Sequence, residues 1–119
     1  MKVAVTTSGS TLDAPLDGRF GRAARFVMYD LDTSTFAVLD NAQQLDAVQG
    51  AGIQAAEAVA RAGAKAVITG HCGPKAFRVL AAAGVSVHTT DAATVQDALA
   101  RYRAGTLPAL SAADVEGHW

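Results

Sequence analysis

The chain has 119 residues, of which 50% are hydrophobic and 18% are charged, and its formal net charge is −1. This length and composition predict one globular domain with a hydrophobic core, and the near-neutral charge argues against nucleic-acid binding, which normally needs a basic surplus. No segment approaches the roughly 18 continuous apolar residues of a membrane helix, and the first residues lack a signal-peptide pattern, so we expect a cytoplasmic protein that binds no membrane. The single cysteine excludes an internal disulfide and a four-cysteine metal site within one chain.

The N-terminal half of the sequence predicts three strands and a long loop. Residues 1–7 are rich in β-formers and predict the first strand. Residues 8–21 are polar and contain three glycines, which is typical of a loop, and loops of this length in compact domains often carry function. Residues 25–31 and 35–41 are two further β-rich runs, and the short turn at 32–34 between them predicts a hairpin.

The C-terminal half predicts alternating helices and strands. After a polar connection over residues 42–49, the expected elements are a helix at 53–61, a strand at 64–69, a helix at 74–83, a strand at 85–89, a helix from Asp91 or Thr94 to about Arg103, and a C-terminal tail at 104–119. Strands joined by helices run parallel, with right-handed crossovers, whereas the first three strands suit an antiparallel meander. We therefore predict an α/β domain over residues 1–103, with a mixed five-stranded sheet of order 3-2-1-4-5 and three helices.

In this sheet the carboxyl ends of the first and fourth strands lie side by side. Open α/β sheets bind their ligands at this edge. The loop at 8–22 and the stretches Gly50–Gly52 and Gly70–Lys75 would meet there. We therefore expect the functional site at the carboxyl edge of the sheet.

The stretch Gly70-His71-Cys72-Gly73-Pro74-Lys75 forms the corner between a buried strand and a helix. Pro74 suits the first helical position, so the only cysteine should lie just outside the helix. Exposed N–H groups and the positive end of the helix dipole favour an anion there, either a ligand or the Cys72 thiolate, and His71 and Lys75 add further donors. The alternative is a tight turn that holds an inert, buried thiol.

Two other glycine-containing stretches have two interpretations each. Arg19, Phe20 and Arg22 stand at the end of the long loop, where they would form a mobile flap over an anion; alternatively the loop is solvated and Phe20 packs on the core. Gly50 and Gly52 would bring backbone N–H groups close to an anion, although the pair lacks the third glycine of a dinucleotide fingerprint. The alternative is close packing of an alanine-rich helix on the sheet.

These stretches together resemble a known family. They are Gly21-Arg22 with Phe26, the run Gly50-Ala51-Gly52-Ile53-Gln54-Ala55-Ala56, and the run Val67-Ile68-Thr69-Gly70-His71-Cys72-Gly73-Pro74-Lys75-Ala76-Phe77. They are similar to the dinitrogenase iron–molybdenum cofactor biosynthesis family, which includes NifX-type cofactor carriers and the C-terminal domain of NifB-type proteins. The resemblance covers roughly residues 1–103, and its most specific part is the run around Cys72.

The resemblance implies a ribonuclease-H-like, three-layer fold and the binding of a preformed, anionic metal–sulfur cluster. We expect a molybdenum–copper sulfide cluster or one related to the iron–molybdenum cofactor, surrounded by a basic, glycine-rich rim. Cys72 would be the metal contact, since soft metals such as copper(I) favour sulfur ligands. The complete expected site is Arg19, Phe20, Arg22, Gly50, Gly52, Ile53, His71, Cys72, Gly73 and Lys75, in which Phe20 and Ile53 give apolar cover.

Two other function classes remain as alternatives. Nucleases of the ribonuclease-H-like fold need clustered carboxylates on the central strands, and neither residues 1–7 nor residues 64–69 contain an acid. A nucleophilic pair of Cys72 and His71 lacks an evident orienting acid, so we expect no enzymatic activity. The chain would otherwise be a small regulatory or protein-interaction module without a cluster, using its tail or the free edge of its third strand to bind an unidentified partner.

Overall fold

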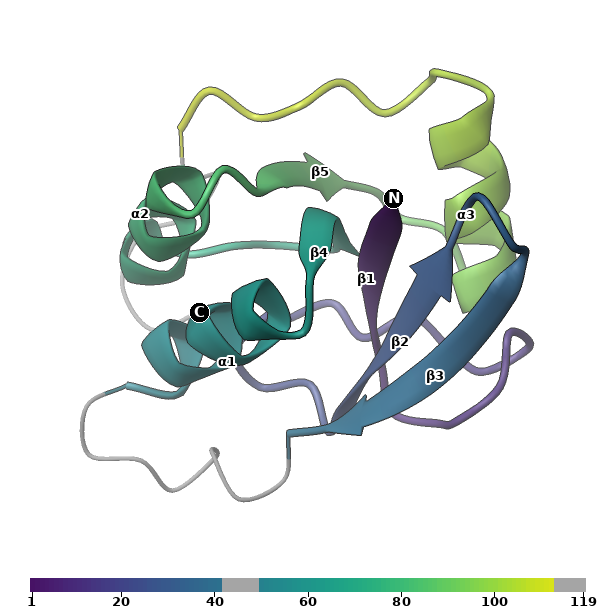
Figure 1. The fold of residues 1–119 in the computed structure, drawn as a ribbon, viewed down its shortest axis with the longest axis horizontal. Coiled ribbons are helices and arrows are strands. Elements are labelled where there is room, and N and C mark those ends of the chain that lie inside the picture. Colours follow the sequence, from purple (N-terminus) through teal and green to yellow (C-terminus); the bar gives the residue numbers. More distant parts are fainter. Residues whose placement is uncertain (42–49, 113–119) are drawn as a thin grey trace.

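The computed structural model describes residues 1–41 and 50–112, and its sheet has the predicted strand order. Its elements are β1 (Lys2–Thr7), β2 (Arg25–Asp30), β3 (Thr35–Asp40), α1 (Ala51–Arg61), β4 (Ala64–Thr69), α2 (Pro74–Ala82), β5 (Ser86–Thr89) and α3 (Val95–Arg103). Strand β1 pairs antiparallel with β2 and parallel with β4, which gives a mixed sheet of order β3-β2-β1-β4-β5 (Figure 1). The predicted α/β fold is confirmed, while the connection at 42–49 and the end of the tail lie outside the described residues.

The sheet is the middle of three layers, because alternate residues of its central strands feed two separate cores. Ala4 in β1 packs with buried residues of α1 and α2 on one face. Val3 and Val5 pack with buried residues of α3 on the other face. Figure 1 shows α1 and α2 next to each other, with α3 apart from them. None of the helices in residues 1–41 and 50–112 is long and apolar enough to cross a membrane.

The long loop between β1 and β2 is bound to the carboxyl edge of the sheet. The backbone N–H of Asp17 donates to the carbonyl of Thr6 (2.9 Å), and the N–H of Phe20 donates to the carbonyl of His71 (3.1 Å). The side chain of Phe20 is fully buried, and its ring centroid lies 5.5 Å from that of Phe26. Of the two interpretations of this loop, packing of Phe20 on the core is therefore the one that the structure supports.

The first part of the C-terminal tail covers the outer edge of β5. The N–H of Leu110 donates to the carbonyl of Val87 (2.8 Å), and Nδ1 of His88 lies 2.7 Å from the carbonyl oxygen of Leu107. The ring of His88 also meets the ring of Tyr102 edge-on, with centroids 4.9 Å apart. One of the two outer strands of the sheet is thus covered by the chain itself.

The loop and the corner after β4 touch through two glycines. A Cβ atom added to Gly70 would lie 2.7 Å from both Cα and the carbonyl oxygen of Gly18, closer than real Cβ atoms come. A Cβ atom added to Gly18 would meet nothing within 4 Å. The contact therefore requires glycine at position 70 but not at position 18.

This asymmetry gives a prediction for protein stability. We expect Gly70→Ala to lower the free energy of unfolding by about 1–3 kcal/mol, the usual effect of adding a methyl group where no space exists. Gly18→Ala is the matched control and should stay within about 0.5 kcal/mol of the parent. Denaturant unfolding of the two variants measures both values, and equal effects would show that the backbone contact is absent in solution.

Candidate functional site

Helices α1 and α2 begin side by side at the carboxyl edge of the sheet. A Cβ atom added to Gly52, in the first turn of α1, would lie 3.3 Å from Cβ of Ala76, in the first turn of α2. The N-cap residues are Gly50 and Gly73, neither helix has a side-chain cap, and neither carries an acidic residue in its first turn. Both helix ends therefore direct backbone N–H groups and positive dipole ends to the same place.

Helix α3 begins differently. Its N-cap residue is Thr94, whose hydroxyl oxygen accepts a hydrogen bond from the N–H of Asp97 (3.1 Å), and Asp97 adds a negative charge in the first turn. The N-terminus of α3 thus has a side-chain cap and an acid that complements its dipole. The N-termini of α1 and α2, on the other face of the sheet, have neither.

The corner between β4 and α2 has the predicted form. Pro74 is the first residue of α2, and Cys72 lies outside both elements, so the prediction that this cysteine precedes the helix is confirmed. Arg19 forms an isolated parallel bridge with His71, which brings the end of the long loop alongside the corner. Gly50 has a φ of 96°, a left-handed conformation that favours glycine, where the chain turns into α1.

The ten predicted site residues divide into an exposed group and a covered group. The exposed group contains four basic residues, and we call it the basic rim: Arg19, Arg22, His71 and Lys75. Gly50, Gly52 and Ile53 are half-buried. Phe20, Cys72 and Gly73 are buried, and the first two belong to the hydrophobic core on the α1 and α2 face.

The structure brings some of these residues together more closely than others. Arg19 lies against His71, and Gly52 lies against Ala76, which directly follows Lys75. Arg22 follows Arg19 through a tight turn in which its N–H donates to the carbonyl of Arg19 (3.3 Å). The thiol of Cys72 is fully buried in the hydrophobic core, 3.7 Å from the carbonyl oxygen of Gly73, whereas the residues of the basic rim are exposed.

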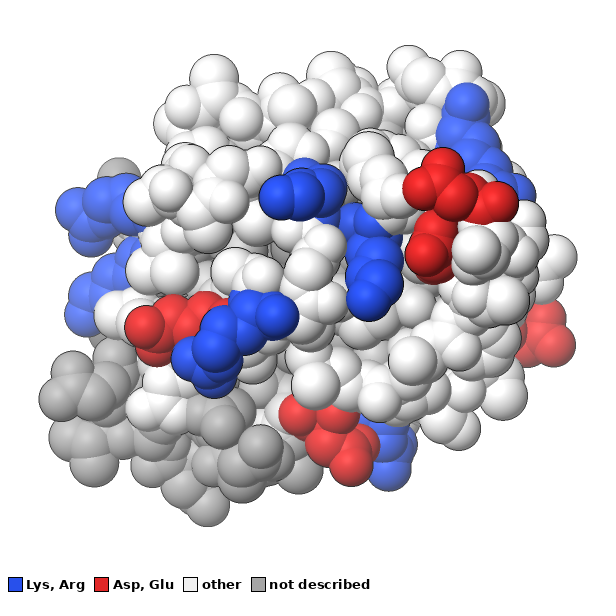
Figure 2. All heavy atoms as spheres, in the orientation of Figure 1, with Lys and Arg blue, Asp and Glu red and all other residues white. Residues whose placement is uncertain are grey.

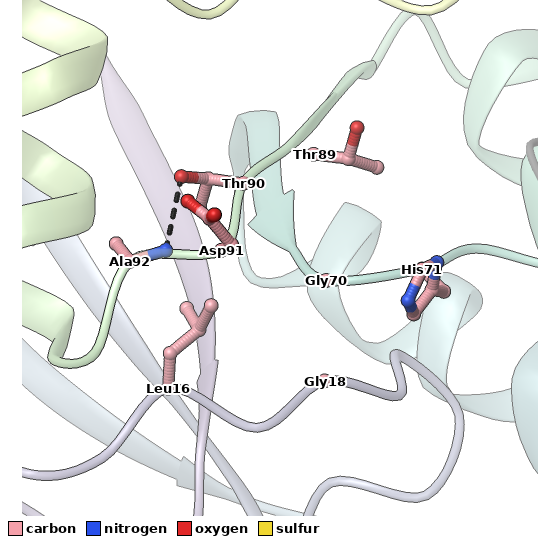
Figure 3. Close-up of a pocket in the computed structure, with 8 residues that line it drawn as sticks. All are labelled: Leu16, Gly18, Gly70, His71, Thr89, Thr90, Asp91 and Ala92. Atoms are coloured by element: carbon pink, nitrogen blue, oxygen red, sulfur yellow. Dashed lines mark hydrogen bonds between the residues drawn. The ribbon is translucent and has the colours of Figure 1, made fainter.

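A pocket of about 500 Å³ adjoins the basic rim at the carboxyl ends of β4 and β5. Figure 3 shows His71 at one end and Asp91 at the other, with Gly18 and Gly70 between them. The guanidinium of Arg101 hydrogen-bonds Asp91 (2.8 Å) and holds the pKa of this carboxyl below its ordinary value. Asp91 therefore stays ionised, and the guanidinium of Arg101 compensates its negative charge.

The sequence analysis did not identify several residues of this region. Thr89 is the last residue of β5 and Thr90 follows it, so both line the pocket; the rule that placed the other stretches at the carboxyl edge would have placed them too. Asn41 follows β3 and is buried; its side-chain amide donates to the carbonyl of Ala23 (2.8 Å). Its Oδ1 has no hydrogen-bond partner among the described residues. A buried asparagine gives no signal in a sequence that separates it from an exposed turn residue.

The described residues offer no ready site for a bare metal ion. No group of three or more His, Cys, Asp or Glu side chains in residues 1–41 and 50–112 is arranged to hold one. Figure 2 shows the charged side chains in small groups on a largely uncharged surface, with basic and acidic side chains next to each other in several of these groups. Around the starts of α1 and α2 the described residues therefore offer backbone N–H groups and basic side chains rather than a set of metal ligands.

Comparison with known proteins identifies the family. The family model described as dinitrogenase iron-molybdenum cofactor matches residues 1–105. The apo form of the orange protein from Desulfovibrio gigas is 40% identical, with a TM-score of 0.92 and 96% of each chain covered. A NifB-like protein from Thermotoga is 30% identical, with a TM-score of 0.84 and 98% of each chain covered.

A dinitrogenase-like protein from Methanocaldococcus jannaschii shares the fold at 14% identity, with a TM-score of 0.69 and coverage of 94% of this chain and 96% of that one. No curated protein matches the sequence. The family model nevertheless spans every element of the sheet and all three helices. The chain therefore belongs to the dinitrogenase iron–molybdenum cofactor family.

Proposed function

We propose that this protein binds and carries a preformed, anionic metal–sulfur cluster at the basic rim. Family membership and the similarity to the orange protein point to a cofactor-binding or carrier role. The observation that carries the proposal is the pair of adjacent helix N-termini, which lack side-chain caps and first-turn acids. A molybdenum–copper sulfide cluster or one of the iron–molybdenum cofactor type is the cargo that fits this chemistry.

The available groups match what such a cluster lacks. A cluster that brings its own sulfides has its metals already ligated, and one chain with one cysteine can supply only one thiolate. The remaining requirement is compensation of negative charge. Backbone N–H groups of α1 and α2 and the side chains of Arg19, Arg22 and Lys75 supply it, and His71 adds a donor.

Cys72 has a secondary role in this proposal. Its thiol is fully buried with Phe20 and Ala76 in the core beneath the basic rim. A bond from its sulfur to a cluster metal, which copper(I) would favour, needs the loop that holds Phe20 to move. Charge and backbone donors therefore make the first contacts, and Ile53 and Gly52 give the half-buried apolar surface on which sulfides rest.

The same burial argues against the enzymatic alternative. A nucleophile must reach its substrate, yet Cys72 is fully buried while the neighbouring His71 is exposed. The described residues supply no group of carboxylates for paired metals either. We therefore propose a carrier of a finished cluster and no catalytic role.

The first test uses tetrathiomolybdate with copper(I) as the probe. We expect the metal-free protein to form a stable chromophore with it and to bind it less tightly as salt rises. The reason is that the Debye length falls from about 10 Å at 0.1 M to about 3 Å at 1 M ionic strength, which screens exposed charges. Absorbance titrations at several salt concentrations measure this. If the protein forms no chromophore with the probe, the carrier proposal is wrong.

The second test removes charge from the rim. We expect the double variant Arg19→Gln/Arg22→Gln to weaken probe binding by roughly 10- to 30-fold, because each exposed charge contact contributes about 1 kcal/mol or less. The matched control is Arg61→Gln/Lys65→Gln, which removes the same charge at exposed positions at the other end of α1 and the start of β4. Equal weakening in both variants would show only an effect of net charge.

The third test separates charge from thiolate ligation. We expect Cys72→Ala to retain probe binding within about threefold, since the contacts that dominate are electrostatic. Alanine is preferred to serine because the site is apolar and a buried hydroxyl would destabilise it. Loss of binding by this variant, with an unchanged circular dichroism spectrum and no salt dependence in the parent, would make the thiolate the anchor.

A further inference from the structure

Strand β3 is the other outer strand of the sheet, and within residues 1–41 and 50–112 only β2 pairs with it. Five of its six residues are exposed, and the sixth, Leu39, is half-buried. The side chains of Phe36 and Val38 are 41% and 39% exposed, and apart from Met1 they are the exposed large hydrophobic residues of the described chain. Figure 1 shows β3 at the outside of the sheet, opposite the edge formed by β5.

Both apolar side chains lie on the face that α3 covers only in part. Phe36 stands opposite Tyr29 and Val38 stands opposite Val27 in the β2–β3 pair. Tyr29 and Val27 belong to the core under α3, which packs against β1. The apolar surface of this face thus continues from the core to β3, where α3 does not cover it.

The backbone of β3 offers hydrogen-bond groups at the same residues. The N–H of Asn41 donates to the carbonyl of Ala24 (2.8 Å), so this pair is hydrogen-bonded. Hydrogen-bonded and non-bonded pairs alternate in an antiparallel ladder, so Thr35, Ala37 and Leu39 bond to β2. The N–H and C=O groups of Phe36, Val38 and Asp40 therefore point away from the sheet.

The usual protections of an outer strand are absent from β3. It contains no Lys, Arg or Pro, and its register with β2 runs without a bulge from Thr35 to Asp40. Its one charge, on Asp40, is paired with Arg25 at 3.0 Å. Proteins that avoid association at strand edges normally place a charge, a proline or a bulge there.

We propose that β3 pairs antiparallel with β3 of a second copy of this chain, giving a two-fold dimer with a continuous sheet. With Ala37 on the two-fold axis, Phe36 of each copy stands opposite Val38 of the other. This register uses the outward N–H and C=O groups of both residues in four hydrogen bonds and joins the two exposed apolar surfaces.

The charges of the strand agree with this register. Asp40 lies opposite position 34 of the second copy, so the two Asp40 carboxylates stand about 20 Å apart at 3.4 Å per residue. That distance exceeds the Debye length of about 8 Å at physiological salt, so they repel little. The register centred on Val38 would instead place Phe36 opposite the charged Asp40. The apolar and charged side chains of β3 are thus compatible with those of a second β3 strand, which is why we choose a second copy of the chain as the partner.

The dimer leaves the cluster site free. No residue of the basic rim belongs to β3, so pairing of this strand covers none of them. Because the two β3 strands run in opposite directions, the carboxyl edges of the two sheets face opposite ways. The inference therefore stands apart from the proposed function, and each can fail without the other.

The test is the molar mass of the full chain, measured by light scattering over a wide range of concentration. We expect twice the chain mass of 12.1 kDa at high concentration. Val38→Lys should leave a monomer under the same conditions, because a lysine blocks an outer strand. The control Ala81→Lys adds the same charge at an exposed position of α2 and should remain dimeric.

Cysteine cross-linking tests the register. Ala37→Cys should form a disulfide-linked dimer on mild oxidation, since position 37 faces itself as a close, non-hydrogen-bonded pair. Thr35→Cys should not, because it faces Leu39 of the second copy. A monomeric parent at every concentration, or a dimer that survives Val38→Lys, would overturn the proposal, and a dimer without the Ala37→Cys cross-link would overturn its register. Val38→Lys should bind tetrathiomolybdate with copper(I) as the parent does, which separates the two proposals.

Discussion

The contact between Gly18 and Gly70 is the constraint on which the site depends. At this point the long loop and the corner after β4 approach each other without side chains between them. The approach aligns Arg19 with His71 and lets the N–H of Phe20 reach the carbonyl of His71. Burial of the Phe20 ring in the core then fixes the loop from below. The position of the rim arginines thus follows from a backbone contact and one buried aromatic ring.

The electrostatic character of the site follows from what its helices lack. Most helix N-termini are completed by a side-chain cap or an acid, as α3 is by Thr94 and Asp97. In α1 and α2 the N-cap residues are glycines, so no capping side chain accepts a hydrogen bond from the N–H groups of the first turn. The small residues Gly52 and Ala76 let the two helices approach each other. The paired helix starts therefore offer backbone N–H donors and no acidic group.

The sequence predicts the elements of the sheet well because their signals are local. Pro74 marks the start of α2, and the alternation of strands and helices leads to the strand order. The orientations of Phe20 and Cys72 could not be predicted, because each depends on packing against residues distant in the sequence. The sequence left two positions open for each, at the ligand as cover and metal contact or in the core, and the structure places both side chains in the core. Their part in binding remains a prediction.

The nearness of the two helix ends was likewise expected only in outline. Sheet order places the stretches at Gly50 and Gly70 on one edge, but the direct contact between Gly52 and Ala76 depends on how closely two helices pack. Asn41 is a similar case, because its burial results from its position under the loop that contains Ala23.

Donors that belong to the backbone have a consequence for how such a site can change over generations. The N–H groups at the starts of α1 and α2 persist whatever side chains stand near them, provided that the glycine caps remain. The four side chains of the basic rim are exposed and lie outside the hydrophobic core, so substitutions there change the charge of this surface more than the packing of the core. If the proposed carrier function holds, one scaffold can keep its backbone donors for anions while mutation of a few surface positions changes the size and charge of the cargo that it prefers.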